Sequence, residues 1–166
     1  TKSLWAVPSF KRDQKPRPTD PNVKPVISVQ HVDAAYGDTK VLDDVSFDVY
    51  EGMTVAVVGE SGSGKSTTAR CITGLLPPLK GEILFRGEKL PPSYKDRTKD
   101  QLRQCQMIYQ MADTALNPKV RISEIIGRPA QFYMGLQGID LKNRVDELLD
   151  LIELEPSKYY NRYPTE

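Results

Sequence analysis

A glycine-rich run in the first half of the chain carries the residues best suited to chemistry. It reads Gly59-Glu60-Ser61-Gly62-Ser63-Gly64-Lys65-Ser66-Thr67, an undistorted GxxxxGK(S/T) pattern. The glycines allow the backbone to curl so that successive N–H groups point inward, and a helix that follows adds its own free N–H groups and positive dipole end. Residue frequencies give a chance glycine turn of this pattern a probability on the order of one percent. The run therefore predicts a site for a polyphosphate.

Three residues at the end of this run have separate roles in such a site. Lys65 is predicted to reach the β- and γ-phosphates as a point charge, and the Ser66 hydroxyl is predicted to be a Mg²⁺ ligand. Thr67 is expected to contribute through its backbone N–H. Small-molecule kinases, GTPases and transport ATPases share the pattern, so the loop alone leaves the class of protein open.

Two elements must hold the loop in place. Residues 53–58, MTVAVV, form an almost unbroken apolar run after Glu51-Gly52, which predicts a buried parallel strand. A helix is expected from Ser66 to Leu76, stopped by Pro77-Pro78. The order strand, loop, helix is the context that the phosphate pattern requires.

Further strands and helices are expected on both sides of the loop. Period-2 alternation predicts half-buried strands at Val26–Val32 and around Val45, Phe47 and Val49, another strand at Ile83 and Phe85 before a turn at Arg86-Gly87, and a short one at 106–110. A helix is expected over Ile122–Leu136. A second helix carries a single apolar stripe at Leu141, Val145, Leu148, Leu149 and Ile152.

Composition narrows the range of partners. The chain has 166 residues, with 23 Lys+Arg against 22 Asp+Glu, a formal net charge of +1, and 2 cysteines. No domain-wide basic field exists, so we expect no nucleic-acid partner. Two cysteines form no disulfide framework, which favours a reducing compartment. No apolar run approaches the roughly 20 residues that span a bilayer, so a membrane role is expected to come through a partner.

Three sequence features together resemble the nucleotide-binding subunit of ABC transporters. They are the phosphate-loop stretch 61–67, the Tyr36-Gly37 element, and Gln110 followed by Ala115-Leu116-Asn117-Pro118. More narrowly, they resemble the dipeptide and oligopeptide importer branch, over about Val26 to Glu166. The resemblance implies an α/β fold, a P-loop NTPase (ABC ATPase) core with an antiparallel β subdomain and part of the helical subdomain.

The resemblance also implies roles for two residues outside the loop. Tyr36 matches the aromatic residue that stacks on adenine, although sequence alone favours a half-buried strand residue. Gln110 matches the switch glutamine that approaches Mg²⁺ and the attacking water, where its amide can orient a water but cannot abstract a proton. Without the family, Gln110 is an ordinary polar residue that ends a strand. Met111 stands where an acidic residue is usual.

The same resemblance divides the chain. Residues 26–112 correspond to the ATP-binding core with the P-loop, and residues 113–166 to a partial helical subdomain. Residues 1–25, rich in proline, are expected to be a linker. Residues 1–8 resemble the run that closes a peptide-importer ATPase domain, so the linker hypothesis includes the tail of a preceding ABC domain in a tandem protein.

Several parts of a complete ABC ATPase are missing from this sequence. After Tyr163-Pro164-Thr165-Glu166 there is no LSGGQ signature, and no apolar strand ends in the Asp-Glu pair of a Walker B motif. Asp146-Glu147 is expected to be a solvated helix face, and His31 a strand residue rather than the switch histidine. We therefore expect an incomplete chain, a fragment or one completed by another chain, that is inactive in hydrolysis alone.

The resulting hypothesis is the ATP-binding portion of an ABC importer ATPase. With ATP and Mg²⁺ it would couple ATP binding and hydrolysis to uptake of peptides or similar solutes. Its expected partners are transmembrane permease subunits and a second ABC ATPase domain, which would hold it on the cytoplasmic, inner face of the cell membrane. Two alternatives remain open at this point: a noncatalytic nucleotide-binding interaction module and a P-loop small-molecule kinase.

Overall fold

The protein was analysed as a computed structural model, which describes residues 22–109, 111 and 115–165. The chain divides into two compact units, Thr1–Arg97 and Thr98–Glu166. Residues 1–21, Gln110, residues 112–114 and Glu166 lie outside the described residues, so most of the expected linker is not described. Each unit is considered by itself.

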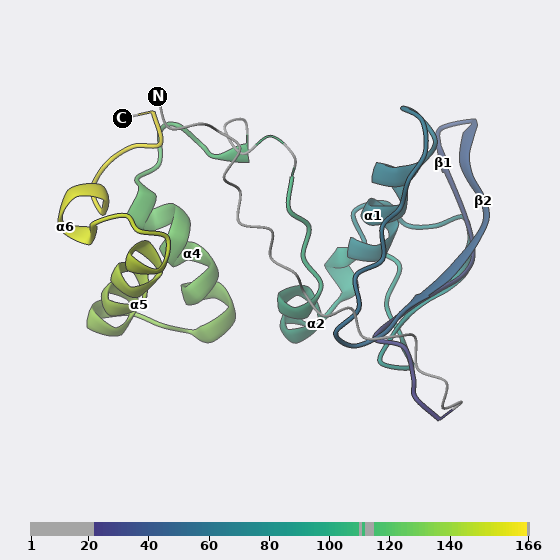
Figure 1. Ribbon diagram of the computed structural model, residues 1–166, viewed down its shortest axis with the longest axis horizontal. Helices are drawn as coiled ribbons and strands as arrows, with labels where there is room; N and C mark the ends of the chain where they lie inside the picture. The colour runs from purple at the N-terminus through teal and green to yellow at the C-terminus, as the bar shows by residue number, and fades with distance from the viewer. Residues whose placement is uncertain (1–21, 110, 112–114, 166) are drawn as a thin grey trace, which may run out of the picture. The chain divides into compact units, whose positions relative to one another are not determined.

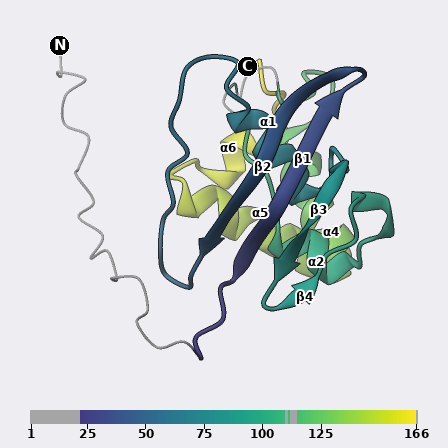
Figure 2. The same cartoon turned by 90° about the vertical axis from the view of Figure 1, so that its right-hand side faces the viewer.

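The first unit is built on a four-stranded antiparallel sheet. Its strands are β1 (Ile27–Tyr36), β2 (Thr39–Val49), β3 (Lys80–Phe85) and β4 (Glu88–Lys89), in the order β2-β1-β3-β4 (Figure 2). In the β1–β2 hairpin, Ile27 pairs with Val49 at one end and Tyr36 with Thr39 at the other. The three strands expected from alternation in this unit are confirmed, and so is the turn between β3 and β4.

A bulge interrupts the centre of β1. His31 and Asp44 both have positive φ, 50° and 51°, and the His31 ring lies 2.7 Å from the Asp44 carboxylate at the surface. Gly81 of β3 faces the bulge, where a Cβ atom would overlap the His31 carbonyl oxygen. His31 is thus a strand residue, as expected.

Asp33 connects the two strands of the hairpin beside this bulge. Its carboxylate accepts a hydrogen bond of 2.8 Å from the backbone N–H of Asp44 and lies 3.0 Å from the ammonium of Lys40. The hydrogen bond from Asp44, together with Lys40, holds the pKa of Asp33 below its ordinary value.

The core of this unit lies between the sheet and the first helix, α1 (Lys65–Thr73). Cys71 is the helix residue at the centre of the core, and burial raises the pKa of its thiol. Val29 and Val32 of β1 both join this core although they are three positions apart, because the bulge between them shifts the alternation of side chains by one residue. The buried set is Val29, Val32, Ala34, Leu42, Cys71, Ile83 and Leu90.

The end of α1 differs from the sequence prediction. The helix stops at Thr73 with Gly74 in the left-handed region at φ 76°, not at Pro77-Pro78. The N–H of Tyr94, which opens the short helix η1 (Tyr94–Asp96), donates to the Gly74 carbonyl at 2.9 Å. Arg97 is buried and donates to the Ile72 carbonyl in the last turn, at 2.7 Å. A glycine in the left-handed region can end a helix before the chain reaches a proline, and Gly74 does so here.

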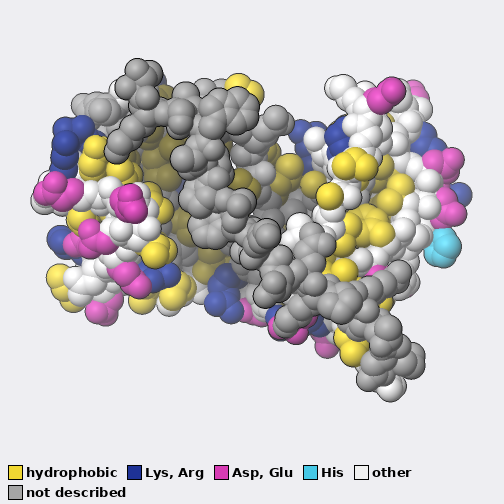
Figure 3. Space-filling model, viewed as in Figure 1, with side chains coloured by type: hydrophobic (Ala, Val, Ile, Leu, Met, Phe, Trp, Pro, Cys, Tyr) yellow, Lys and Arg dark blue, Asp and Glu magenta, His cyan; other side chains and the backbone are white. Residues whose placement is uncertain are grey.

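Two predicted strands are not strands in the structure. Residues 53–59 form no ladder with any described strand, and Val58 is 87% exposed. The described part of 106–110 likewise forms no ladder, with Ile108 96% exposed; Gln110 lies outside the described residues. An apolar run expresses a preference for burial, but a strand also needs a neighbouring strand to satisfy its backbone groups. Figure 3 shows hydrophobic side chains reaching the visible surface.

The second unit is helical. It contains α2 (Lys99–Gln104), α4 (Ile122–Met134), α5 (Gly138–Leu151) and the short α6 (Pro156–Tyr159), and α4 and α5 pack on each other (Figure 1). The two long helices predicted from sequence are confirmed. Val145 and Leu149 of the predicted stripe are buried, whereas Ile152 lies past the end of α5 and is exposed.

None of the helices described in this chain combines the length and the apolar composition needed to cross a bilayer.

Candidate nucleotide-binding site

The glycine-rich run forms a closed loop that leads directly into α1. The N–H of Ser63 donates to the carbonyl of Glu60 at 3.2 Å, which closes a turn inside the loop. Gly64 is the N-cap of α1 at φ 92°, a conformation that a residue with a side chain adopts only under strain. A Cβ atom at Gly64 would also lie 2.6 Å from Leu42 Cδ2 and 3.3 Å from the Val41 carbonyl oxygen. Strand β2 therefore packs directly against the loop, and only glycine fits at this contact.

The first turn of α1 presents an uncompensated positive end. Gly64 has no side chain to cap the first N–H groups, and no acidic residue lies in the first turn. Such N–H groups and the helix dipole favour an anion. Thr67 and Thr68 are buried, and the Thr68 hydroxyl donates to the Gly64 carbonyl at 3.0 Å, which fixes the turn. The Ser66 hydroxyl lies at the exposed side of the same turn.

Lys65 spans the loop. Its ammonium donates to the carbonyl oxygens of Gly59 at 2.8 Å and Glu60 at 2.5 Å, and reaches the Ser63 hydroxyl at 3.4 Å. These acceptors are uncharged, and a phosphate oxygen with a full negative charge forms a stronger hydrogen bond with an ammonium group. The cation is thus held at the place where a polyphosphate would replace weaker partners.

Tyr36 lies in the same unit, at the end of β1. Its side chain is 42% exposed, and its hydroxyl accepts a hydrogen bond of 2.8 Å from Arg70 Nη1. Arg70 belongs to α1, so this bond joins the strand end to the phosphate-loop helix. Sequence reasoning did not single out Arg70, because the contact spans 34 positions and no local pattern marks it.

The structure places the other predicted residues as follows. Residues 59–67 and Tyr36 all belong to the first unit, whereas Gln110 lies outside the described residues. Asp146 and Glu147 pair with Lys142 and Arg144 along α5, at 2.5 Å and 2.7 Å, which confirms a solvated helix face. Among the residues that the structure describes, no cluster of His, Cys, Asp or Glu could hold a metal ion by itself.

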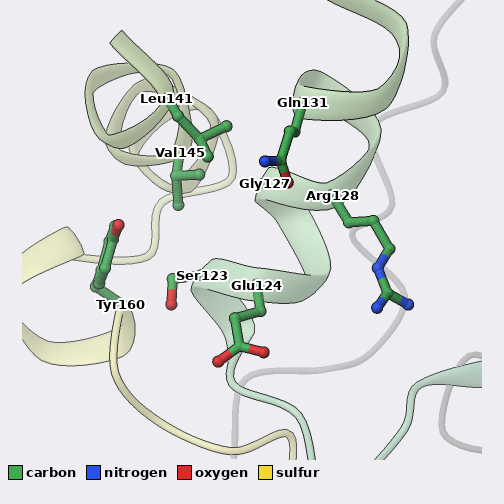
Figure 4. A pocket seen from close by; sticks show the side chains of 8 residues that line it. All are labelled: Ser123, Glu124, Gly127, Arg128, Gln131, Leu141, Val145 and Tyr160. Atoms are coloured by element: carbon green, nitrogen blue, oxygen red, sulfur yellow. The ribbon is translucent and has the colours of Figure 1, made fainter. Parts of the chain in front are cut away.

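The helical unit has a pocket of its own. It forms where α4 and α5 approach at Gly127, at which a Cβ atom would lie 3.4 Å from Val145 Cγ2. Its volume is about 260 Å³, and Figure 4 shows its lining residues on α4, on α5 and at Tyr160, with the Arg128 side chain extending away from Tyr160. The lining residues are Ser123, Glu124, Gly127, Arg128, Gln131, Leu141, Val145 and Tyr160. None of them belongs to the predicted nucleotide site.

A closed glycine loop, an uncapped helix N-terminus and an ammonium group across the loop define a P-loop nucleotide-binding domain. The family comparison agrees, since a profile of the ABC transporter family matches residues 42–164. The chain belongs to the ABC transporter family. The resemblance found in its sequence is therefore confirmed.

Individual relatives support this membership. The chain is 41% identical over 128 residues to the oligopeptide transport ATP-binding protein OppF of Haemophilus influenzae, which covers 76% of this chain and 38% of OppF. It is 40% identical over 116 residues to the nickel import ATP-binding protein NikE of Brucella suis, which covers 70% of this chain and 44% of NikE. The chain thus spans less than half the length of these curated relatives.

A solved structure shows the same fold. A dimeric ATP-binding cassette in a post-hydrolysis state, bound to ADP and Pi, has a TM-score of 0.64 to this chain at 26% identity. The match covers 84% of this chain and 62% of that one. The predicted fold class, a P-loop ABC ATPase core with an antiparallel β subdomain, is confirmed by this likeness and by the observed sheet.

Proposed function

We propose that this chain binds MgATP, with the phosphates in the 59–67 loop and the adenine against Tyr36. The observation that supports this most is the loop, which brings the Lys65 ammonium and the free end of α1 to one place. On binding, Lys65 exchanges the carbonyls of Gly59 and Glu60 for oxygens of the β- and γ-phosphates.

Magnesium fits the oxygen donor that the loop offers. The Ser66 hydroxyl follows Lys65 at the exposed side of α1, and Mg²⁺ prefers hard oxygen ligands. When bound, the ion neutralises charge on the β- and γ-phosphates. In this proposal Gln110 is a second oxygen donor to the ion and orients the attacking water.

We further propose that the chain works within an ABC importer ATPase that takes up peptides or similar solutes. The names of the relatives support import of oligopeptides, and one of them names nickel. The partners would be transmembrane permease subunits and a second ABC ATPase domain, with residues 113–166 as the helical subdomain. Association with the permease would place the chain on the inner face of the cell membrane.

ATP titration of the full chain with Mg²⁺ tests the proposal. Removing the Lys65 ammonium by K65A deletes a charge-assisted hydrogen bond, so we expect affinity to fall by about 10- to 100-fold. K95A, at an exposed lysine of η1 in the same unit, is the matched control and should leave affinity unchanged. Equal affinity of K65A and the wild type would refute the loop as the phosphate site.

Product analysis separates this function from its alternatives. We expect phosphate release close to background, because the sequence contains neither a signature motif nor a Walker B pair. Phosphate transfer to a small acceptor would support a kinase instead. Nucleotide-dependent capture of a partner without phosphate release would favour an interaction module.

A further inference from the structure

The phosphate-loop helix and the exposed aromatic at the end of β1 are joined by one hydrogen bond. Arg70 Nη1 donates to Tyr36 Oη at 2.8 Å, although the two residues are 34 positions apart. Both belong to the first unit, in which α1 contacts β1 and β2 (Figures 1 and 2). The bond takes the hydroxyl edge of the Tyr36 ring.

A second contact fixes the hairpin against the same helix. Leu42 Cδ2 and the Val41 carbonyl of β2 lie against Gly64, the N-cap residue of α1. The hairpin is therefore attached to α1 at its N-cap, Gly64, and six positions later through Arg70. Two attachments along one helix set the position of the intervening hairpin end relative to the phosphate loop.

Tyr36 needs such a restraint. It is the last residue of β1, it precedes a turn with Gly37 at φ 56°, and its side chain is 42% exposed. An exposed side chain at a strand end keeps rotamer freedom, which it loses when a ligand stacks on it. A hydrogen bond formed before binding removes that freedom in advance.

We propose that Arg70 is a positioning residue for nucleotide binding, which holds the Tyr36 ring to the phosphate-loop helix before the base of a nucleotide stacks on it. This rests on the proposed function, in which the phosphates occupy residues 59–67. Arg70 acts on the base through Tyr36 and not on the phosphates through its charge. The hydrogen bond therefore raises the affinity for a nucleotide, which has a base, and leaves the affinity for a polyphosphate without a base unchanged.

Two ligands and four variants of the full chain test this. ATP and inorganic tripolyphosphate are titrated, with Mg²⁺, into the wild type, R70M, Y36F and the double variant. Y36F keeps the ring and removes only the hydroxyl that Arg70 holds. R86M, at another exposed arginine of the first unit, is the matched control.

If Arg70 acts through Tyr36, the affinities of these variants for the two ligands should follow a specific pattern. R70M and Y36F should each lower the affinity for ATP by about three- to ten-fold, which corresponds to the cost of ordering one side chain on binding. The double variant should be no weaker than either single variant, since both remove the same bond. Tripolyphosphate affinity should stay within about two-fold in all of them, which also shows that the loop remains folded. R86M should bind both ligands like the wild type.

Other patterns overturn it. Equal loss of ATP and tripolyphosphate in R70M would show that Arg70 acts through charge, and additive losses in the double variant would show that the two residues act separately. Unchanged ATP affinity in R70M would remove the role altogether.

Two further variants separate this inference from the proposed function. If K65A leaves both ligands unaffected, the loop proposal fails. If K65A weakens both ligands while Y36A leaves ATP unaffected, the loop proposal stands and the role of Arg70 is refuted.

Discussion

The contact between β2 and the phosphate loop makes Gly64 sensitive to substitution. In G64A the new Cβ would meet Leu42 Cδ2 at 2.6 Å and the Val41 carbonyl oxygen at 3.3 Å, with φ at 92°. The left-handed backbone costs about 1–2 kcal/mol for a residue with a side chain. Overpacking against buried Leu42 adds about 1–3 kcal/mol. We expect G64A to lower the free energy of unfolding by about 2–5 kcal/mol.

A neighbouring glycine provides the control. Gly62 has a similar φ of 86°, yet a Cβ atom there would meet nothing within 4 Å. G62A should therefore show only the backbone cost, about 1–2 kcal/mol. The assay is urea unfolding followed by far-UV circular dichroism.

The double variant G64A/L42A tests the contact itself. It should be less destabilised than the sum of the single variants, because truncating Leu42 removes the atom that the new Cβ at position 64 would overlap. Equal destabilisation of G64A and G62A, or strict additivity with L42A, would refute the packing of β2 on the loop as the reason that position 64 is glycine.

Two further predictions concern stability in each unit. D33N should make stability depend less on pH in the acid range. Because the pKa of Asp33 is lowered in the folded state, its carboxylate stabilises the fold at pH values above the ordinary pKa of 3.8. This contribution is lost as the pH falls through the lower pKa of the folded state. Melting temperatures measured from about pH 7 to about pH 2.5 check this, and parallel curves for D33N and the wild type would contradict it. L149A, at a fully buried residue of α5, should cost about 2–5 kcal/mol, whereas L151A, at a residue 77% exposed, should stay within about 0.5 kcal/mol. Urea unfolding of both variants decides this, and similar losses would mean that Leu149 does not support the helical unit.

Local sequence patterns predicted the strands and helices whose packing partners lie within the described residues. The alternation at Val26–Val32 marked β1, in which Val29 and Val32 are buried on either side of the bulge, and the stripe through Val145 and Leu149 marked α5, in which both residues are buried. Gly74 was the signal missed at the end of α1, where a left-handed cap took precedence over the next prolines.

Features that depend on contacts between residues far apart in the sequence could not be predicted. Residues 53–58 have the composition of a buried strand, but whether they form one depends on a partner strand, which composition does not encode. The turn at residues 59–64 and the start of α1 could be predicted because the pattern is local, whereas the phosphate-binding role of residues 59–67 stays a prediction. Arg70 could not, since its significance comes from meeting Tyr36 across the fold. The role expected of Gln110 stays a prediction.

The far end of α1 has a consequence for how the loop responds to a ligand. Arg97 donates to the Ile72 carbonyl, and the Tyr94 N–H donates to the carbonyl of Gly74, so the helix is pinned opposite its binding end. These two hydrogen bonds restrain α1 from shifting when a negatively charged ligand binds at its N-terminus. In the proposed function, the uncapped N–H groups at the start of α1 therefore belong to a helix that is already fixed at its other end, so that part of their ordering cost is met on folding rather than on nucleotide binding.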